Sequence, residues 1–154
     1  SPAAAKNAAH EFILGVTDQP WAPAVVTRLL TNRLPVEVHF FALRLVSVLA
    51  QRGSFDAVQV QVLQEALFST ACGDLTQLPA FVREKLAQAL AAVAVYSADW
   101  PSGWPQLDNR LLEAGKQSPA HAALMSMFFR AIGELLQSDA ASARLDSKRR
   151  KALL

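Results

Sequence analysis

Residues 35–52 read PVEVHFFALRLVSVLAQR and carry apolar side chains in two separate rows at helical spacing. A helix on a protein surface needs only one apolar row, which faces the core. Two rows therefore predict a helix that is covered on two sides by neighbouring helices. The first row consists of Val36, Phe40, Leu43 and Ala50, and the second of Val38, Phe41, Leu45, Val48 and Leu49.

The same periodicity continues in both directions along the chain and predicts seven helices and an unfinished eighth. Polar or Gly/Pro breaks separate them, with Gly53 and Gly73 at two of the helix ends. In the first helix we expect Ala5, Ala9, Phe12, Ile13 and Val16 to face inward, and in the second Trp21, Val25, Leu29 and Leu30. The expected helices are residues 3–16, 21–32, 35–52, 56–72, 81–97, 105–113, 119–136 and 145–154.

Composition supports an all-α fold. The chain has 154 residues, of which 52% are hydrophobic and 18% charged, and this balance excludes a disordered chain. Ala and Leu supply 50 residues and there are only six Gly, a bias toward good helix formers. No uncharged stretch reaches the ~20 residues that a transmembrane helix needs, so no membrane partner is expected.

Taken in pairs, the helices form about four hairpins, the last of them incomplete. The hairpins cover roughly residues 3–33, 35–73, 80–114 and 119–154, so that the whole chain is one region. Their first helices begin about 32, 45 and 40 residues apart, close to the ~40–47 residues of a HEAT repeat. The pattern thus predicts a HEAT-repeat α-solenoid, and a compact bundle of seven or eight helices is the alternative.

Charge is distributed unevenly along the chain. Residues 1–138 contain 10 Lys+Arg and 11 Asp+Glu, whereas residues 139–154 contain 5 basic and 2 acidic residues. A generally basic, nucleic-acid-binding surface is therefore not expected. The local basic run is a candidate contact for RNA phosphates, and a solubilising helix face or a nuclear-localisation-like run are its alternatives. It consists of Lys148, Arg149, Arg150 and Lys151.

The residue types of catalytic and metal sites do not cluster in the sequence. The Gly residues are scattered singly, so no phosphate-binding loop is expected. His10, His39 and His121 fall on three different helices without partners at ligand spacing. Cys72 lies at a helix C-terminus, where the helix dipole disfavours a thiolate. We therefore expect no enzymatic activity, no metal and no cofactor.

A Trp-Pro turn carries a resemblance to a known family. Residues 96–107 read YSADWPSGWPQL and follow an apolar helix, and this arrangement resembles the third HEAT repeat of the importin-β (karyopherin) superfamily. Residues 9–12 and 21–30 are similar to the first repeat of that family, and residues 38–45 to the start of its second. The turn itself consists of Trp100, Pro101, Trp104 and Pro105.

The following segments are most similar to the exportin subfamily that carries short hairpin and other structured RNAs. These are residues 107–115, 129–136 and 145–150. The resemblance implies the amino-terminal part of a much longer nuclear export receptor, which shuttles between nucleus and cytoplasm. Its implied partners are the GTP-bound form of the small GTPase Ran, structured RNA such as microRNA precursors or tRNA, and nucleoporins through the rest of the receptor. GTP and magnesium would belong to bound Ran.

In this family Ran-GTP binds the face formed by the second helix of each hairpin. In this chain, the polar residues expected to be exposed on the corresponding helices are therefore the Ran-binding candidates. The stretch from Ser54 to Pro79 has three acidic residues and no Lys or Arg, which suits a basic partner surface. A solvated helix face is the simpler alternative for any single residue. The candidates are Arg28, Asn32, Gln61, Gln64, Glu65 and Asp108.

Two other functions remain open at this point. An import receptor of the same superfamily would release cargo when Ran-GTP binds, so the sign of the coupling between the two ligands separates import from export. A Ran-independent helical scaffold that holds RNA-processing factors or other proteins would bind them without regard to the nucleotide on Ran.

Overall fold

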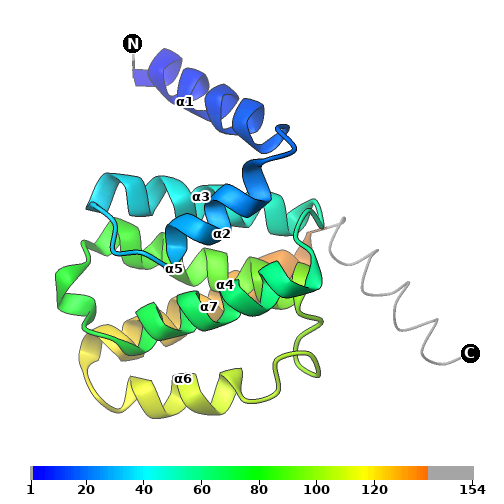
Figure 1. Ribbon diagram of the computed structural model, residues 1–154. Coiled ribbons are helices and arrows are strands. Elements are labelled where there is room, and N and C mark those ends of the chain that lie inside the picture. Colours follow the sequence, from blue (N-terminus) through cyan, green and yellow to red (C-terminus); the bar gives the residue numbers. More distant parts are fainter. Residues whose placement is uncertain (1, 139–154) are drawn as a thin grey trace, which may run out of the picture.

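The computed structural model describes residues 2–138, and within this range the chain folds into seven α-helices without a β-strand (Figure 1). The all-helical prediction is confirmed for these residues, and the first seven expected helices lie within a few residues of their expected positions, whereas the expected eighth, residues 145–154, lies outside the described residues. The helices are α1 (Pro2–Thr17), α2 (Ala22–Leu30), α3 (Val36–Gln51), α4 (Ala57–Cys72), α5 (Ala80–Ala92), α6 (Leu107–Gly115) and α7 (Pro119–Gln137). A short 3-10 helix, η1 (Leu75–Gln77), precedes α5, and a π-helical segment, η2 (Val93–Ser97), extends it.

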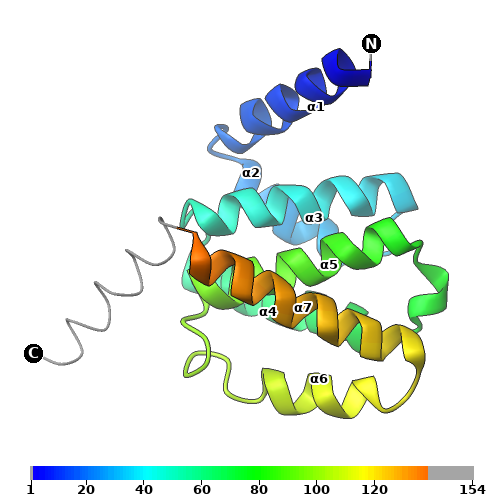
Figure 2. The ribbon, with the colours of Figure 1, turned by 180° about the vertical axis from the view of Figure 1, so that it is seen from behind.

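The helices are arranged in two layers. Helices α3, α5 and α7 lie side by side in one layer, which faces the viewer in Figure 2. Helices α2 and α4 pack against each other in the second layer, which is nearer to the viewer in Figure 1. Helix α6 lies at the end remote from α1 and contacts both α7 and α4.

Helices α3 and α5 form the centre of the core. The prediction that residues 35–52 are covered on two sides is confirmed, because α3 contacts α1 and α2 as well as α5 and η2. Helix α5 is buried even more completely, between α3, α7 and α4. Every residue of η2 except Ser97 is buried as well. The buried residues of α5 are Val82, Leu86, Ala87, Ala89, Leu90, Ala91 and Ala92.

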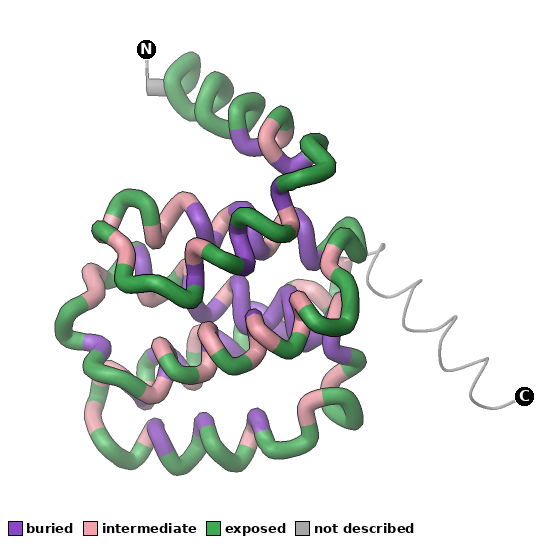
Figure 3. The backbone as a smooth tube through the Cα atoms, viewed as in Figure 1, coloured by how far each residue is buried: buried purple, intermediate pink, exposed green. Residues whose placement is uncertain are grey.

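Helix α1 departs from its expected packing. Residues 3–12 are all exposed, and the helix projects away from the remaining helices (Figures 1 and 3). Phe12, expected to face inward, is 61% exposed, although its ring lies 5.8 Å from that of Phe41. Only the end of the helix is anchored, through buried Ile13 and partly buried Val16. The expected stripe is therefore wrong for its first two turns, because α1 has neighbours only at its C-terminal end.

Helix α2 buries Leu30 as expected, but otherwise a different apolar row from the one expected. Ala22, Val26 and Leu30 are buried, whereas Trp21 and Val25 are 50% and 41% exposed. Both rows have helical spacing, so periodicity alone does not distinguish them. The small side chain of Ala22 allows a close approach to the core, whereas the larger Trp21 and Val25 remain at the surface.

The turn between η2 and α6 has a tightly packed backbone. Ala98 N–H donates to the carbonyl oxygen of Val93 over 2.8 Å, which closes η2. Asp99 then adopts a left-handed conformation with φ of 53°, which Asp tolerates better than most residues, and the Trp100–Pro101 peptide bond is cis. Helix α6 begins at Leu107, two residues later than expected.

Gly103 is the residue at which this turn approaches itself most closely. A Cβ atom at this position would lie 1.5 Å from the carbonyl oxygen of Ala98, so only glycine fits without moving the backbone. A Cβ atom at Gly133, in the interior of α7, would meet no atom within 4 Å. The two glycines therefore give a matched pair of substitutions.

We expect Gly103→Ala to lower the free energy of unfolding by about 1–3 kcal/mol, because the added methyl group forces the turn to shift. Gly133→Ala should leave it unchanged or raise it by up to about 1 kcal/mol, since Ala is the better helix former. Urea denaturation followed by circular dichroism measures both. Equal stability of the two variants would contradict the close approach of Gly103 to Ala98.

Candidate partner-binding face

Two shallow grooves run along the exposed side of α4. The α4–α6 groove, of about 530 Å³, is lined by Gln61, Gln64, Glu65, Phe68, Ser69, Trp104 and Arg110. The α2–α4 groove, of about 400 Å³, is lined by Leu30, Thr31, Asn32, Val62, Glu65, Ala66, Ser69 and Thr70. Glu65 and Ser69 line both, so they lie on the ridge between the two grooves. We call the surface formed by the two grooves the α4 face.

The sequence of α4 explains why these residues point outward. The helix begins with a capping box, in which Asp56 Oδ1 accepts from the N–H of Gln59 over 2.8 Å and Gln59 Oε1 accepts from the N–H of Asp56 over 2.9 Å. Leu63, Leu67 and Ala71 then form a buried row at i, i+4 and i+8. Because that row faces the core, the polar positions between its members face solvent.

The structure brings four of the six Ran-binding candidates together on the α4 face. Gln61, Gln64 and Glu65 line the α4–α6 groove, and Asn32 lines the α2–α4 groove. Arg28 is exposed on α2 and lines neither groove. Its carbonyl oxygen accepts a hydrogen bond from Asn32 Nδ2 over 2.9 Å, which orients the Asn32 side chain.

Asp108, the sixth candidate, has a structural partner. Its Oδ1 accepts a hydrogen bond from Trp100 Nε1 over 2.7 Å. This bond ties the first turn of α6 to the Trp-Pro turn, and both Trp100 and Trp104 are partly buried against the core. Asp108 therefore positions α6 beside α4, and its carboxylate is not freely available to a partner.

Arg110 and Phe68 were not among the predicted site residues. The guanidinium carbon of Arg110, on α6, lies 4.3 Å from the ring centroid of Phe68, on α4, within the range of a cation–π interaction. The two residues are 42 positions apart in the sequence, so no local pattern pairs them. Trp104 also lines this groove, whereas the sequence predicted it only as part of the Trp-Pro turn.

The expected acidic strip contains only one carboxylate without a partner. Asp56 is occupied by the capping box, and Asp74 accepts from the backbone and hydroxyl of Thr76 over 3.0 and 2.6 Å. These hydrogen bonds hold the pKa of the Asp74 carboxyl below its usual value. The side chain of Glu65 forms no ion pair or hydrogen bond with any other residue in the range 2–138. The free negative charge of this strip is thus centred on the α4 face.

Cys72 and His121 lie near the C-terminal end of α4. Burial raises the pKa of the Cys72 thiol, and the nearby positive charge of Arg110 partly opposes the rise. His121 is buried at the start of α7, with Nε2 2.8 Å from the carbonyl oxygen of Gly73 and Nδ1 2.6 Å from Ser118 Oγ. Since the carbonyl oxygen of Gly73 can only accept, Nε2–H of His121 donates to it. His121 thereby joins the end of α4 to the start of α7.

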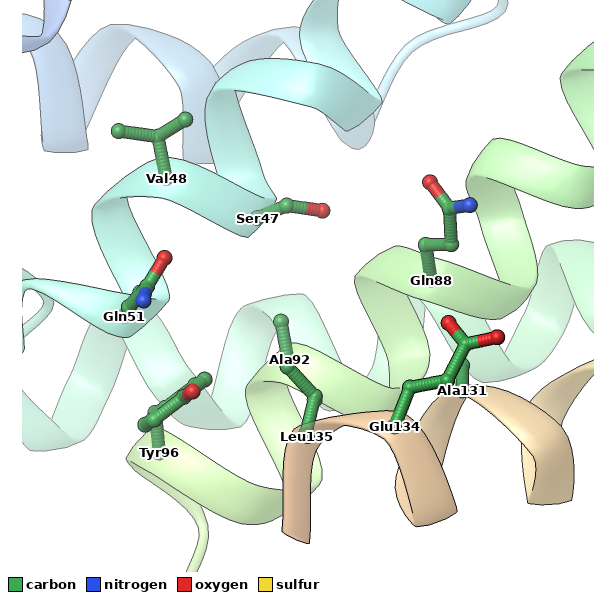
Figure 4. Close-up of a pocket in the computed structure, with 9 residues that line it drawn as sticks. All are labelled: Ser47, Val48, Gln51, Gln88, Ala92, Tyr96, Ala131, Glu134 and Leu135. Atoms are coloured by element: carbon green, nitrogen blue, oxygen red, sulfur yellow. The ribbon is translucent and has the colours of Figure 1, made fainter. Parts of the chain in front are cut away.

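A separate pocket of about 230 Å³ opens on the layer formed by α3, α5 and α7 (Figure 4). It contains none of the candidate site residues predicted from the sequence. Glu134 and Gln88 are its polar side chains from α7 and α5, and Gln88 Oε1 already accepts from Lys85 Nζ over 2.9 Å. Its lining is completed by Ser47, Val48, Gln51, Ala92, Tyr96, Ala131 and Leu135.

Several sequence predictions concern sites of other kinds. Lys148, Arg149, Arg150 and Lys151 lie outside the described residues. Within residues 2–138 no three His, Cys, Asp or Glu side chains are grouped so that they could hold a metal ion. In the same range, no helix is both long enough and apolar enough to cross a lipid bilayer.

The chain matches no protein-family model, no curated protein and no solved structure. The resemblance to the importin-β superfamily therefore stays a prediction that depends on the residues quoted for it.

We expect Asp108→Ala to lower the free energy of unfolding by about 1–3 kcal/mol, because the partly buried indole N–H of Trp100 loses its acceptor. Asp108→Asn retains an acceptor oxygen and should stay within about 0.5 kcal/mol of the parent protein. Urea denaturation monitored by tryptophan fluorescence measures the difference. If both variants unfold like the parent, Asp108 does not position α6 through Trp100.

We expect the rate of Cys72 alkylation by iodoacetamide to rise with pH around a midpoint above the usual thiol pKa, since burial favours the neutral thiol. Arg110→Gln removes a positive charge that favours the thiolate, so the midpoint should move to still higher pH. Arg130→Gln, a charge change on the exposed surface of α7, is the control and should leave the midpoint in place. A lower midpoint in Arg110→Gln would contradict the assigned interaction.

Proposed function

We propose that the chain is the amino-terminal HEAT-repeat region of a nuclear export receptor. In this proposal α1 pairs with α2, α3 with α4 and α5 with α6 in successive hairpins, and the helices stack as an α-solenoid. Helix α7 begins a fourth hairpin. The α4 face binds Ran-GTP, and structured RNA is the cargo. The chain performs no catalysis, and GTP and magnesium belong to Ran.

One observation carries the proposal: the second helices α2 and α4 lie side by side, so that Asn32, just after α2, shares one face with Gln61, Gln64 and Glu65 of α4. A partner helix or loop that lies along α4 reaches both grooves at once. The three amide side chains offer donors and acceptors, and Glu65 offers an unpaired carboxylate for a basic side chain of the partner.

The RNA part of the proposal concerns the basic run Lys148–Lys151. Residues 1–138 carry one more acidic than basic residue, so phosphate binding falls to this run or to parts of the receptor beyond this chain. Binding of Ran-GTP and RNA is coupled in the proposed mechanism, because both select the same curvature of the solenoid. Hydrolysis of GTP on Ran then removes the coupling and releases the cargo in the cytoplasm.

We expect the chain to bind Ran loaded with a non-hydrolysable GTP analogue at least about 10-fold more tightly than Ran loaded with GDP, as measured by calorimetry. Glu65→Lys should weaken binding of the GTP form about 10-fold or more, since it places like charges opposite a basic partner. Glu84→Lys is the matched control. Glu84 lies on α5 in the opposite layer, so the same change of charge should have little effect.

Two results would contradict this proposal. Equal binding to both nucleotide forms would favour the Ran-independent scaffold, and equal losses in Glu65→Lys and Glu84→Lys would place the contact away from the α4 face. Addition of a hairpin RNA separates export from import. Tighter binding of Ran-GTP in its presence indicates an exportin, and competition indicates an import receptor.

A further inference from the structure

We propose that the α4–α6 groove is a carboxylate-binding site in which Arg110 binds an Asp or Glu side chain of the protein partner. This inference rests on the proposed function insofar as it takes that partner to be Ran-GTP. The site itself is a property of this chain and is tested without Ran below.

Arg110 is positioned but unpaired. Its guanidinium lies over the ring of Phe68 at 4.3 Å, and Phe68 is itself partly buried against the core. Within the described part of the chain, no ion pair or hydrogen bond joins the side chain of Arg110 to another residue. The stacking thus restrains the guanidinium while its N–H groups stay available, and a planar fork of N–H donors matches the geometry of a carboxylate.

The surroundings of Arg110 favour an ionic contact. Phe68 and Trp104 give the groove apolar walls, and a less polar environment strengthens the attraction between opposite charges. The amide groups of Gln61 and Gln64 line the same groove and can donate to a second oxygen of the ligand. Gln64 Nε2 is only weakly engaged, at 3.5 Å from the carbonyl oxygen of Gly103.

The charge of the groove selects a carboxylate over a phosphate. Glu65 lines the same groove, so a dianionic phosphate would meet both Arg110 and a like charge. A singly charged carboxylate suffers less repulsion, and a basic side chain beside it on the partner would pair with Glu65. The groove therefore fits a partner that presents an acidic residue to Arg110 and a basic residue to Glu65, in a fixed order.

The first experiment tests the site without Ran. N-acetyl-glutamate amide is titrated into the isotopically labelled chain, and the resonances of the Arg110 Nε–H and the Trp104 indole are followed by NMR. N-acetyl-glutamine amide has the same shape without the charge and is the control ligand. We expect shifts that saturate in the millimolar range with the glutamate compound only. Arg110→Gln should abolish the Trp104 shift, whereas Arg130→Gln should retain it.

The second experiment tests the occupant. We expect Arg110→Gln to weaken binding of Ran-GTP about 10- to 100-fold, and Arg110→Lys to weaken it less, because lysine keeps the charge and loses the fork. Unchanged circular dichroism and thermal unfolding of both variants show that the fold is retained. Both variants retain Glu65, so a loss of Ran-GTP binding in them is due to the change at Arg110.

The outcomes of the two proposals are distinguishable. The carboxylate site is overturned if the glutamate compound produces no Arg110-dependent shift, or if the parent chain binds Ran-GTP and Arg110→Gln binds it equally well. If the parent chain does not bind Ran-GTP at all, the proposed function fails. The titration with N-acetyl-glutamate amide alone then decides whether the groove binds carboxylates.

Discussion

The burial of α5 is the constraint on which the remaining structure depends. Leu86 and Leu90 are buried on one side of the helix and Ala87 and Ala91 on others, so neighbouring helices must cover most of its circumference. Helices α3 and α7 cover it within one layer and α4 covers it from the other, and only a strip that includes Glu84 stays exposed. The many Ala residues of α5 keep its surface narrow, which lets these neighbours approach closely.

The position of α4 on α5 determines the candidate site. With Leu63, Leu67 and Ala71 directed at the core, the opposite side of α4 has no neighbour among residues 2–138 and forms the ridge between two grooves. His121 fixes the end of this helix against α7 through the carbonyl oxygen of Gly73. At the other edge, the bond between Trp100 and Asp108 holds α6 so that Arg110 reaches Phe68. Residues that line neither groove thus hold in place the helices that form the grooves.

The sequence predicted the helices well because their periodicity is a local property. Two apolar rows in residues 35–52 indicated cover on both sides, and the structure supplies it. The inward rows of α1 and α2 were right at Ile13 and Leu30 but wrong in part, because both helices carry more apolar residues than their neighbours cover. Phe12 and Trp21 are therefore exposed. Periodicity shows which residues share one side of a helix, but it does not show how many neighbouring helices will cover that side.

Four of the predicted site residues share one face: Gln61, Gln64 and Glu65 lie on the exposed side of α4, and Asn32 follows the end of α2 beside it. Arg110 was not predicted, because its cation–π contact is with Phe68, which lies on another helix. Likewise, only the three-dimensional structure shows that Asp56, Asp74 and Asp108 are already engaged. The sequence gives the number of charged residues, whereas the site depends on which charged side chains have no partner within the described part of the chain.

Glu65 and Arg110 place two charges of opposite sign in one groove, and this arrangement affects how a partner is recognised. Residues 1–138 are nearly neutral overall, so long-range attraction contributes little to the encounter with a partner. Glu65 and Arg110 act only at short range, where the order of acid and base on the partner determines whether both contacts form. A partner turned end for end would place like charges together on both residues. The proposed site therefore selects the orientation of its ligand more strongly than it attracts charge of either sign.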